Sequence, residues 1–331
     1  MKQLVILSGK GGTGKTSVAA AFAHLAQQGP FPLRTVLADA DVDAANLELV
    51  LKPDQVEAHD FIGGSVAVID PERCQGCGIC EQVCRFDAVI LLPPLHPPIF
   101  SQSNPKNASH RISENGRNEG GQGESYSVDP IACDGCAACV YQCPEEAIQM
   151  QPQLAGRWFR SESRYGPLFH AALIPAQENS GKLVTLVKQQ ARLLALDEDY
   201  QAVIVDGPPG IGCPVIAAAS GADLALIVAE PTVAGIQDME RVLQTTAHFR
   251  VPALVCINKA DIYPEGAAQI ETYCRQNRIE TTDHIPFDPS VTEAMVHGEP
   301  VTAFRPNAPA SRALLNLWQD VTNHLLFTEN E

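Results

Sequence analysis

Eight of the eleven cysteines form two matched runs, and this spacing limits the possible fold more than any other feature of the 331-residue chain. The runs are Cys74-x2-Cys77-x2-Cys80-x3-Cys84 and Cys133-x2-Cys136-x2-Cys139-x3-Cys143. The surrounding residues repeat as well, because residues 70–89 resemble residues 129–148 at a constant offset. We therefore expect a small inserted domain at 66–150, built from two related halves around a flexible loop at 93–127 that is rich in Pro, Ser, Asn and Gly.

The spacing of the runs resembles that of bacterial two-cluster ferredoxins, in which each run gives three thiolates to one 4Fe-4S cluster and its last thiolate to the other. The resemblance implies one cluster on Cys74, Cys77, Cys80 and Cys143, and a second on Cys84, Cys133, Cys136 and Cys139. Zinc is the alternative, but zinc sites use paired C-x2-C units rather than triplets. Of the remaining thiols, Cys256 and Cys274 are expected to be buried and inert, and the same is the default for Cys213, whose role is left open.

A phosphate-binding loop opens the chain. A short apolar run at 4–7 is followed by the glycine-rich segment 9–16 and by an Ala-rich helix at 17–27. In this arrangement several backbone N–H groups and the positive end of a helix face one anion. Lys15 is expected to reach the β- and γ-phosphates, and Thr16 to offer its hydroxyl to Mg²⁺.

Five apolar runs, at 4–7, 35–38, 202–205, 224–228 and 253–257, are continuous rather than alternating, which is typical of strands buried on both faces. Helical segments such as 181–195 and 237–249 lie between them. The pattern predicts an α/β fold with a doubly wound, mostly parallel sheet at 1–65 and 151–331 and its ligand at the carboxyl ends of the strands. Residues 157–171 are expected to form a hairpin.

The form K-G-G-T-G-K-T, with Lys10 ahead of Lys15, resembles the deviant phosphate loop of the MinD/ParA superfamily of ATPases, which is related to the nitrogenase iron protein and to Mrp-type ATPases. The resemblance implies a nucleotide-sandwich dimer in which Lys10 acts in trans on the γ-phosphate of the partner's ATP. The partner is then either a second copy or a related ATPase.

The same resemblance assigns roles to further residues. It implies ATP binding by Gly9, Lys10, Gly11, Gly12, Thr13, Gly14, Lys15, Thr16, Ser17, Asn258, Lys259, Pro286 and Asp288. It implies Mg²⁺ binding by Thr16, Asp39 and Asp206, catalysis by Lys10, Lys15 and Asp41, and switch roles for Asp41, Asp43, Gly207 and Gly210. Asp41 would orient the attacking water, although a turn or cap role is the alternative. Asn258 would pair with adenine, whereas N-K-x-D ending at Asp261 also matches the guanine reader of GTPases.

The net charge of −16 argues against a nucleic-acid partner, which needs clustered Lys and Arg. No apolar run approaches the roughly 20 residues of a membrane span, and no export signal precedes the loop, so we expect a cytoplasmic protein without a membrane partner. The C-terminal segment 311–327 has helical apolar spacing but only one full positive charge, Arg312. A helix docked on the core is therefore favoured over a lipid-binding helix.

Three functions fit these features. The first is an iron–sulfur ATPase whose nucleotide-driven dimer switching is coupled to electron transfer between a redox donor and an acceptor. The second is an ATP-dependent factor that assembles or inserts a metallocofactor into a client protein. The third is a ParA-like positioning switch with a redox sensor, which the acidic charge disfavours.

Overall fold

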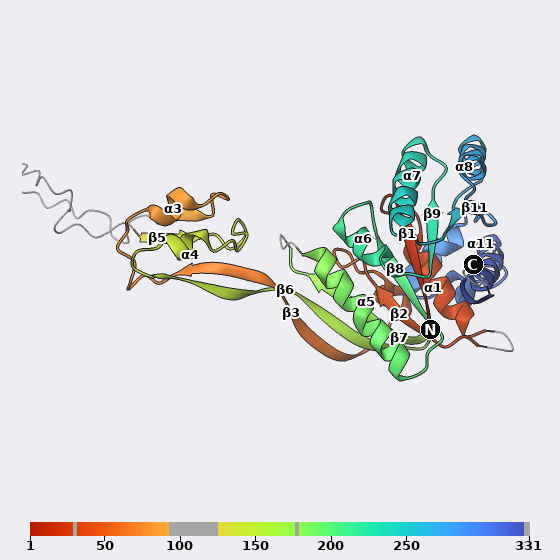
Figure 1. The fold of residues 1–331 in the computed structure, drawn as a ribbon. Coiled ribbons are helices and arrows are strands. Elements are labelled where there is room, and N and C mark those ends of the chain that lie inside the picture. Colours follow the sequence, from red (N-terminus) through yellow and green to blue (C-terminus); the bar gives the residue numbers. More distant parts are fainter. Residues whose placement is uncertain (29–31, 93–124, 176–178, 328–331) are drawn as a thin grey trace, which may run out of the picture. The chain divides into compact units, whose positions relative to one another are not determined.

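The computed structural model describes residues 1–28, 32–92, 125–175 and 179–327, which are drawn in colour in Figure 1. The chain divides into two compact units, Met1–Gly63 with Ala155–Glu331, and Gly64–Leu154. Both boundaries fall inside long strands, β3 (Asp54–Ile69) and β6 (Ile148–Ser163).

A mostly parallel sheet forms the centre of the first unit. Within the described residues the strand order is β11-β10-β9-β1-β8-β2-β7-β6-β3. The strands not yet given are β1 (Lys2–Ser8), β2 (Thr35–Asp39), β7 (Gly166–Leu173), β8 (Ala202–Pro209), β9 (Leu224–Ala229), β10 (Ala253–Ile257) and β11 (Glu280–Thr281). Pairing is parallel from β11 to β7, and β6 and β7 form the predicted antiparallel hairpin. The predicted α/β class and the mostly parallel sheet are therefore confirmed.

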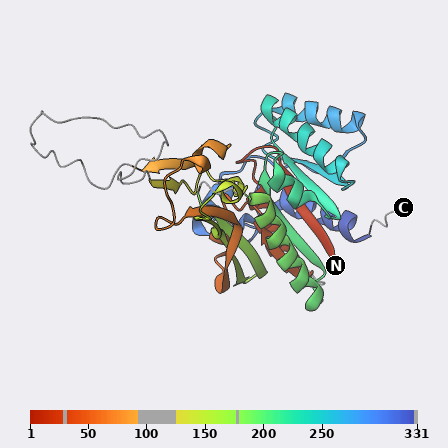
Figure 2. The same ribbon diagram turned by 60° about the vertical axis from the view of Figure 1, so that its left-hand side comes forward.

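Helices cover both faces of this sheet. One face carries α5 (Ser180–Asp197), α6 (Cys213–Ala219), α7 (Val233–His248) and α8 (Pro264–Gln276), and the other carries α1 (Lys15–Ala26), α2 (Leu47–Leu51), α9 (Pro289–His297), α10 (Val301–Phe304) and α11 (Pro309–Phe327). Successive β1 side chains alternate between the two cores, Val5 and Leu7 in one, Leu4 and Ile6 in the other. Figure 2 shows α5 in green and α11 in blue on either side of the red strand β1.

The C-terminal helix α11 is docked on the core, as predicted. Leu317 and Val321 are fully buried, and the Trp318 ring lies 4.9 Å from the Phe22 ring of α1. Burying these side chains removes the apolar stripe from water and stabilises the packing of α11 on α1. Across the described ranges, no helix combines the length and apolarity needed to cross a membrane.

The second unit repeats one motif twice. Each half has a short helix, α3 (Ile79–Val83) or α4 (Ala138–Gln142). Strand β4 (Val89–Leu92), which follows α3, pairs antiparallel with β5 (Ser125–Val128), which precedes α4. Equivalent hydrogen bonds join the two halves in both directions. The Asp70 N–H of the first half donates to the Ala147 carbonyl of the second at 2.8 Å, and the Asp129 N–H of the second donates to the Ala88 carbonyl of the first at 2.7 Å.

Residues 93–124 of the loop predicted at 93–127 lie outside the described residues. Its last part was predicted wrongly, because residues 125–127 belong to β5. The physical reason is the buried side chain of Tyr126, which is 8% exposed and joins the apolar core of the unit. The prediction rested on the polar composition of the whole loop, and one buried aromatic residue does not change that composition.

Candidate functional site

The phosphate loop joins the buried strand β1 to helix α1. Gly14 precedes the first helical residue with a φ of 99°, a conformation that disfavours any side chain. A Cβ added there would also lie 2.5 Å from the Asn258 Nδ2 atom. The loop is therefore packed tightly against the segment after β10, and the N-terminus of α1 is held at the carboxyl edge of the sheet, where an anion is favoured.

Lys15 is buried at the centre of the site, with 6% of the residue exposed. Its ammonium donates to Ser8 Oγ at 2.9 Å, and that hydroxyl donates to the Lys10 carbonyl at 2.7 Å. Burial lowers the pKa of Lys15, while the carboxylates of Asp206, Asp41 and Asp39 oppose the shift. A cationic side chain is thus placed among three acids from two predicted switch segments.

Asp206 and Asp39 are register partners on the adjacent strands β8 and β2. Asp206 is 1% exposed, and neither of its carboxylate oxygens has a hydrogen bond of good geometry, although the Thr16 hydroxyl is close by. Burial raises its pKa to about 6, against the opposing effects of the Thr16 hydroxyl and the Lys15 ammonium. A buried carboxylate with unsatisfied oxygens is costly unless it meets a cation, so the chemistry of Asp206 fits an oxygen-ligated Mg²⁺.

Asp39 organises the first switch. Its oxygens accept N–H groups from Asp41 at 3.1 Å, Asn46 at 3.1 Å and Leu47 at 3.0 Å. Burial, with the nearby charge of Asp206, raises the pKa of Asp39 well above its usual value. Because backbone donors already engage both oxygens, Asp39 fits a Mg²⁺ role less well than Asp206 does.

The two other predicted switch acids differ from each other. Asp41 is half-buried, and burial raises its pKa although the Lys15 charge opposes this. Asp43 is exposed and lies away from Lys15, in the lining of a separate cavity. In the second switch, strand β8 continues through Gly207, and the Gly210 N–H donates to the Ser8 carbonyl at 3.0 Å. This switch is therefore joined directly to the start of the phosphate loop.

Glu230 is a site residue that the sequence prediction missed. It follows the end of β9, and its side chain is 12% exposed. One carboxylate oxygen contacts Lys10 Nζ at 2.7 Å, and the other contacts Lys259 Nζ at 2.5 Å. Burial acts to raise the pKa of Glu230, but hydrogen bonds and charge from both lysines outweigh burial and leave the pKa below its usual value. The sequence did contain one signal for this role: Glu230 directly follows a predicted parallel strand, and ligands bind at the carboxyl ends of such strands.

The predicted base-binding segments lie side by side, because Asn258 and Ile285 form a parallel bridge. The Asn258 amide donates to the Thr13 carbonyl at 2.7 Å and accepts the Lys259 N–H at 2.9 Å. Asn258 therefore braces the phosphate loop, which the sequence did not indicate. One Asp261 oxygen accepts the Phe287 N–H at 2.7 Å, so it already has a partner within the chain.

Three further predicted ATP contacts have other neighbours. Asp288 caps α9, accepting the Ser290 N–H at 2.9 Å, and its other oxygen accepts the Ala310 N–H at 3.2 Å. Pro286 is half-buried beside it, and Ser17 Oγ contacts Met295 Sδ at 3.3 Å. The cap explains the aspartate at 288 without a nucleotide.

The eight matched cysteines line two small cavities in the second unit, each of about 20 Å³. The first is lined by Cys74, Cys77, Cys80 and Cys143, and the second by Cys84, Cys133, Cys136 and Cys139. The last cysteine of each run therefore lies with the first three cysteines of the other run.

Backbone donors also point at two of these sulfurs. The Ala88 N–H donates to Cys84 Sγ and the Ala147 N–H donates to Cys143 Sγ, both at 3.3 Å. Such bonds stabilise thiolates and tune cluster potentials. In the part of the chain that the structure describes, no three His, Cys, Asp or Glu side chains are arranged to hold a single metal ion. A four-iron cluster differs from a single-ion site, because each thiolate binds a different iron.

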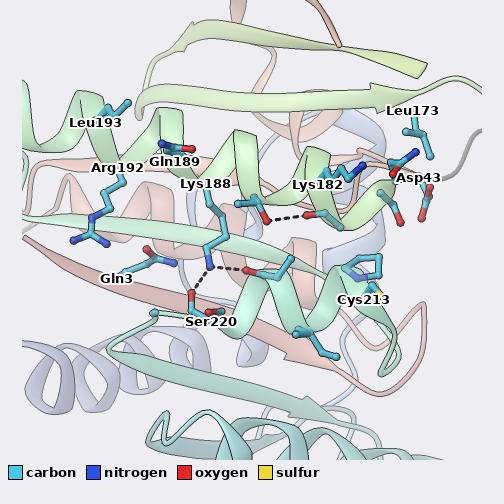
Figure 3. A pocket seen from close by; sticks show the side chains of 18 of the residues that line it. Gln3, Asp43, Leu173, Lys182, Lys188, Gln189, Arg192, Leu193, Cys213 and Ser220 are labelled. Atoms are coloured by element: carbon cyan, nitrogen blue, oxygen red, sulfur yellow. Dashed lines mark hydrogen bonds between the residues drawn. The ribbon is translucent and has the colours of Figure 1, made fainter. Parts of the chain in front are cut away.

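A larger cavity, of about 1350 Å³, lies between α5 and α6, and its lining includes no residue of the phosphate loop. Figure 3 shows Lys188 reaching from α5 to the end of α6, where it donates to the carbonyls of Ala217, Ala218 and Ser220. Cys213 also lines this cavity and is exposed, so the prediction of a buried thiol is wrong there. Cys256 and Cys274 are buried, as predicted.

The sequence profile described as "CobQ/CobB/MinD/ParA nucleotide binding domain" matches residues 4–301. An uncharacterized protein of Methanocaldococcus jannaschii is 29% identical over 259 residues, which is 78% of each chain. The septum site-determining protein MinD of Bacillus subtilis is 28% identical over 163 residues, 47% of this chain and 59% of that protein.

Two further similarities were found, one in sequence and one in fold. An iron-sulfur cluster carrier protein of Pyrococcus horikoshii is 26% identical over 137 residues, 37% of this chain and 45% of that protein. Among solved structures, the MinD cell division protein of Aquifex aeolicus aligns over 98% of both chains with a TM-score of 0.53 and 19% identity. At this identity the structural likeness concerns the fold alone.

Proposed function

The chain belongs to the CobQ/CobB/MinD/ParA family of nucleotide-binding domains and is a P-loop ATPase, and from this premise we propose that its ATP cycle gates electron transfer through two 4Fe-4S clusters. The observation that carries the proposal is the division of the eight cysteines between two cavities, each with four thiols drawn from both runs. Four thiolates per cavity is the ligand number of a four-iron cluster.

Residues around the phosphate loop suit ATP hydrolysis. Lys15 is already placed to exchange its Ser8 contact for phosphate oxygens, and its charge would stabilise the transferred phosphoryl group. Asp41, half-buried beside Lys15, would orient the attacking water. Asp206 and Thr16 would hold Mg²⁺ through oxygen or water, with Asp39 fixing the first switch behind them.

Dimer formation is part of the same proposal. Lys10 belongs to the phosphate loop, but among the described residues its ammonium pairs with Glu230 rather than with the acids around Lys15. A role on the ATP of a second copy, or of a related ATPase, gives this lysine a function that its own site does not require. Nucleotide would then favour the closed dimer by binding it more tightly than the open form.

The cysteine unit would supply one-electron transfer when its clusters are bound. The chain's part is to hold the sulfurs at fixed positions, to shield Cys80 and Cys139, which are the most buried, and to donate N–H groups to Cys84 and Cys143. These contacts set how readily a cluster accepts an electron from a redox donor or passes it to an acceptor.

A series of polar contacts, buried at His170 and Ser161 but partly exposed at Glu48, links the first switch to strand β6, which continues into the cysteine unit. Glu48, on α2 behind Asp39, contacts His170 Nδ1 at 3.0 Å, and His170 Nε2 contacts Ser161 Oγ of β6 at 3.0 Å. A movement of α2 on nucleotide binding would change these contacts. These contacts would offer a physical route for coupling between the first switch and β6.

The test is anaerobic purification with iron and sulfide counts, followed by electron paramagnetic resonance with ADP and with ATP. We expect about eight irons per chain for two cubane clusters, and different midpoint potentials or reduction rates in the two nucleotide states. Cys84→Ala should remove the cluster of the Cys133 cavity and leave the other, and Cys143→Ala should do the reverse. Colourless, sulfide-free protein would reject the clusters, and identical redox behaviour in both nucleotide states would reject the gating.

A second function is supported by the similarity to an iron-sulfur cluster carrier protein. In that role hydrolysis would deliver a cluster or metal centre to a client protein, and the bound iron would be cargo. The two functions differ in iron retention. Loss of iron to an apo-ferredoxin during ATP turnover supports delivery, whereas full retention over many turnovers supports electron transfer.

A further inference from the structure

Glu230 lies between two lysines at the edge of the phosphate loop. Its backbone is fixed by the turn into α7, where Thr232 N–H donates to the Glu230 carbonyl at 2.8 Å and Gly235 packs against the same oxygen. Its carboxylate is therefore a fixed acceptor, and Lys10 and Lys259 each contact a different oxygen. Neither lysine is fully buried, because their side chains are 35% and 33% exposed.

The two lysines are held differently. The Lys259 ammonium also donates to the Gly12 carbonyl at 3.4 Å, so it has a second partner, within the phosphate loop. For the Lys10 ammonium, Glu230 is the one partner found among the described residues. Lys10 can therefore leave Glu230 without leaving a buried carboxylate unpaired, because Lys259 stays in place.

We propose that Glu230 is a positioning residue that holds Lys10 within its own subunit until a partner's nucleotide competes for it. This inference rests on the proposed function, in which Lys10 acts across a dimer. To reach the phosphate oxygens of the partner's ATP, the Lys10 side chain has to turn away from the Glu230 carboxylate of its own subunit, so the two anions compete for one ammonium. The Lys10–Glu230 pair thus sets a threshold that nucleotide-driven dimerisation must exceed.

The size of this threshold follows from the exposure of the pair. Partly exposed ion pairs contribute little free energy. Removing the Glu230 carboxylate should therefore shift the equilibrium between held and free Lys10 by about threefold to fivefold rather than by orders of magnitude. The apparent affinity of the dimer is reduced by the fraction of chains in which Lys10 is held back. Releasing Lys10 should therefore tighten the dimer.

A first measurement examines the contact alone. The full-length, cluster-loaded, nucleotide-free protein is treated with an amine-acylating reagent, and the modification rate of Lys10 is followed by mass spectrometry. Glu230→Gln should raise that rate about threefold to fivefold, because a free amine reacts faster than a paired one. Glu230→Asp, which keeps the charge but shortens the reach, should give an intermediate rate. The matched control is Glu293→Gln, which breaks a carboxylate pair with Arg305 and should leave the Lys10 rate unchanged.

A second measurement examines the consequence. With Mg²⁺ and a non-hydrolysable ATP analogue, the monomer–dimer midpoint is determined by sedimentation for wild type, Glu230→Gln, Lys10→Ala and the double variant. Glu230→Gln should lower the midpoint about threefold, and this gain should vanish in the Lys10→Ala background.

The outcomes separate the two claims. An unchanged Lys10 acylation rate in Glu230→Gln, a raised midpoint, or a gain that persists without Lys10 would each overturn the positioning role. If Lys10→Ala never dimerises, the trans role of Lys10 is supported and the acylation rates decide the role of Glu230. If wild type stays monomeric with the analogue, the dimer of the proposed function fails, whatever the acylation rates show.

Discussion

The Asn258 amide nitrogen lies 2.7 Å from the Thr13 carbonyl oxygen, which joins the segment after β10 to the middle of the phosphate loop. The Asn258 amide oxygen accepts the Lys259 N–H, and the amide nitrogen would lie only 2.5 Å from a Cβ added to Gly14. Asn258 is therefore part of the structure that keeps the loop in its anion-binding shape before any nucleotide arrives.

Replacing this brace should weaken nucleotide binding without abolishing it. Asn258→Ala removes a neutral hydrogen bond contributing about 1 kcal/mol, so the dissociation constants of ATP and ADP should both rise roughly fivefold. Calorimetric titration of the two nucleotides measures this. Asn316→Ala, which removes an exposed contact to Asp283, is the matched control and should bind like wild type. A selective loss for ATP alone would contradict a loop-bracing role.

The buried charge of Asp206 should lower the free energy of unfolding of the nucleotide-free protein at neutral pH. Its folded pKa of about 6 exceeds the unfolded value of 3.8, so between these values the folded state binds a proton that the unfolded state lacks. Stability therefore falls as pH rises through this window, and the charge is a net cost at neutral pH. Asp206→Asn should raise the free energy of unfolding on the order of 2 kcal/mol at pH 7.5 in chelator.

The same change should lower Mg²⁺-dependent ATP hydrolysis, because an amide is a weaker ligand for Mg²⁺ than a carboxylate. The matched variant is Asp39→Asn, whose oxygens already accept three backbone N–H groups. Burial also raises the pKa of Asp39, so Asp39→Asn removes a buried charge as well, but it weakens those three bonds at the same time, and its gain in stability should be the smaller of the two. Urea unfolding in chelator, together with a phosphate-release assay, measures both effects. Equal stabilisation by the two variants would show that the unpaired oxygens of Asp206 are not the cause.

The sequence predicts those parts of the molecule that depend on local patterns. The apolar runs predicted β1, β2, β8, β9 and β10 because strands buried on both faces leave a continuous signature. The family resemblance rests on the spacing of Lys10 and Lys15, which is a local feature too.

The remaining features depend on contacts between distant segments. Glu230 becomes a site residue because β9 ends beside the loop, and Asn258 becomes a brace because β10 ends beside Thr13. Asp288 stays a predicted nucleotide contact, and its additional role as a cap comes from Ser290 and Ala310, which lie in two helices whose approach no local pattern reveals. Cys213 looked like a core thiol, and its exposure is decided by how α5 and α6 pack. Tertiary context, rather than propensity, determines each of these.

Thiol reactivity should distinguish Cys213 from the two other cysteines outside the runs. Cys213 is exposed in the lining of the cavity between α5 and α6, whereas burial raises the pKa of Cys256 to about 12 and that of Cys274 to about 11. A thiol-alkylating reagent applied to cluster-loaded protein at pH 8 should therefore modify Cys213 at least about tenfold faster than either buried thiol. Peptide mass spectrometry gives the three rates. Comparable rates would mean that the first unit opens readily, and Cys213→Ser provides the blank.

Lys188 should make stability depend on pH in the alkaline range. Burial lowers its pKa to about 8 from 10.5, so between these values the unfolded chain keeps a proton that the folded chain has lost. The free energy of unfolding should then rise with pH across this window, by up to about 1.4 kcal/mol per pH unit from this one group. Lys188→Met should remove this contribution, together with the three hydrogen bonds that cap α6. Lys188→Arg keeps the charge but does not titrate here, so it should remove the slope while retaining a cation at the helix end.

The measurement is urea unfolding from pH 7.5 to 10.5. Taking the difference in unfolding free energy between each variant and wild type cancels the contributions of the other titrating groups. Parallel curves for wild type and both variants would show that the Lys188 ammonium is not buried between α5 and α6 in solution.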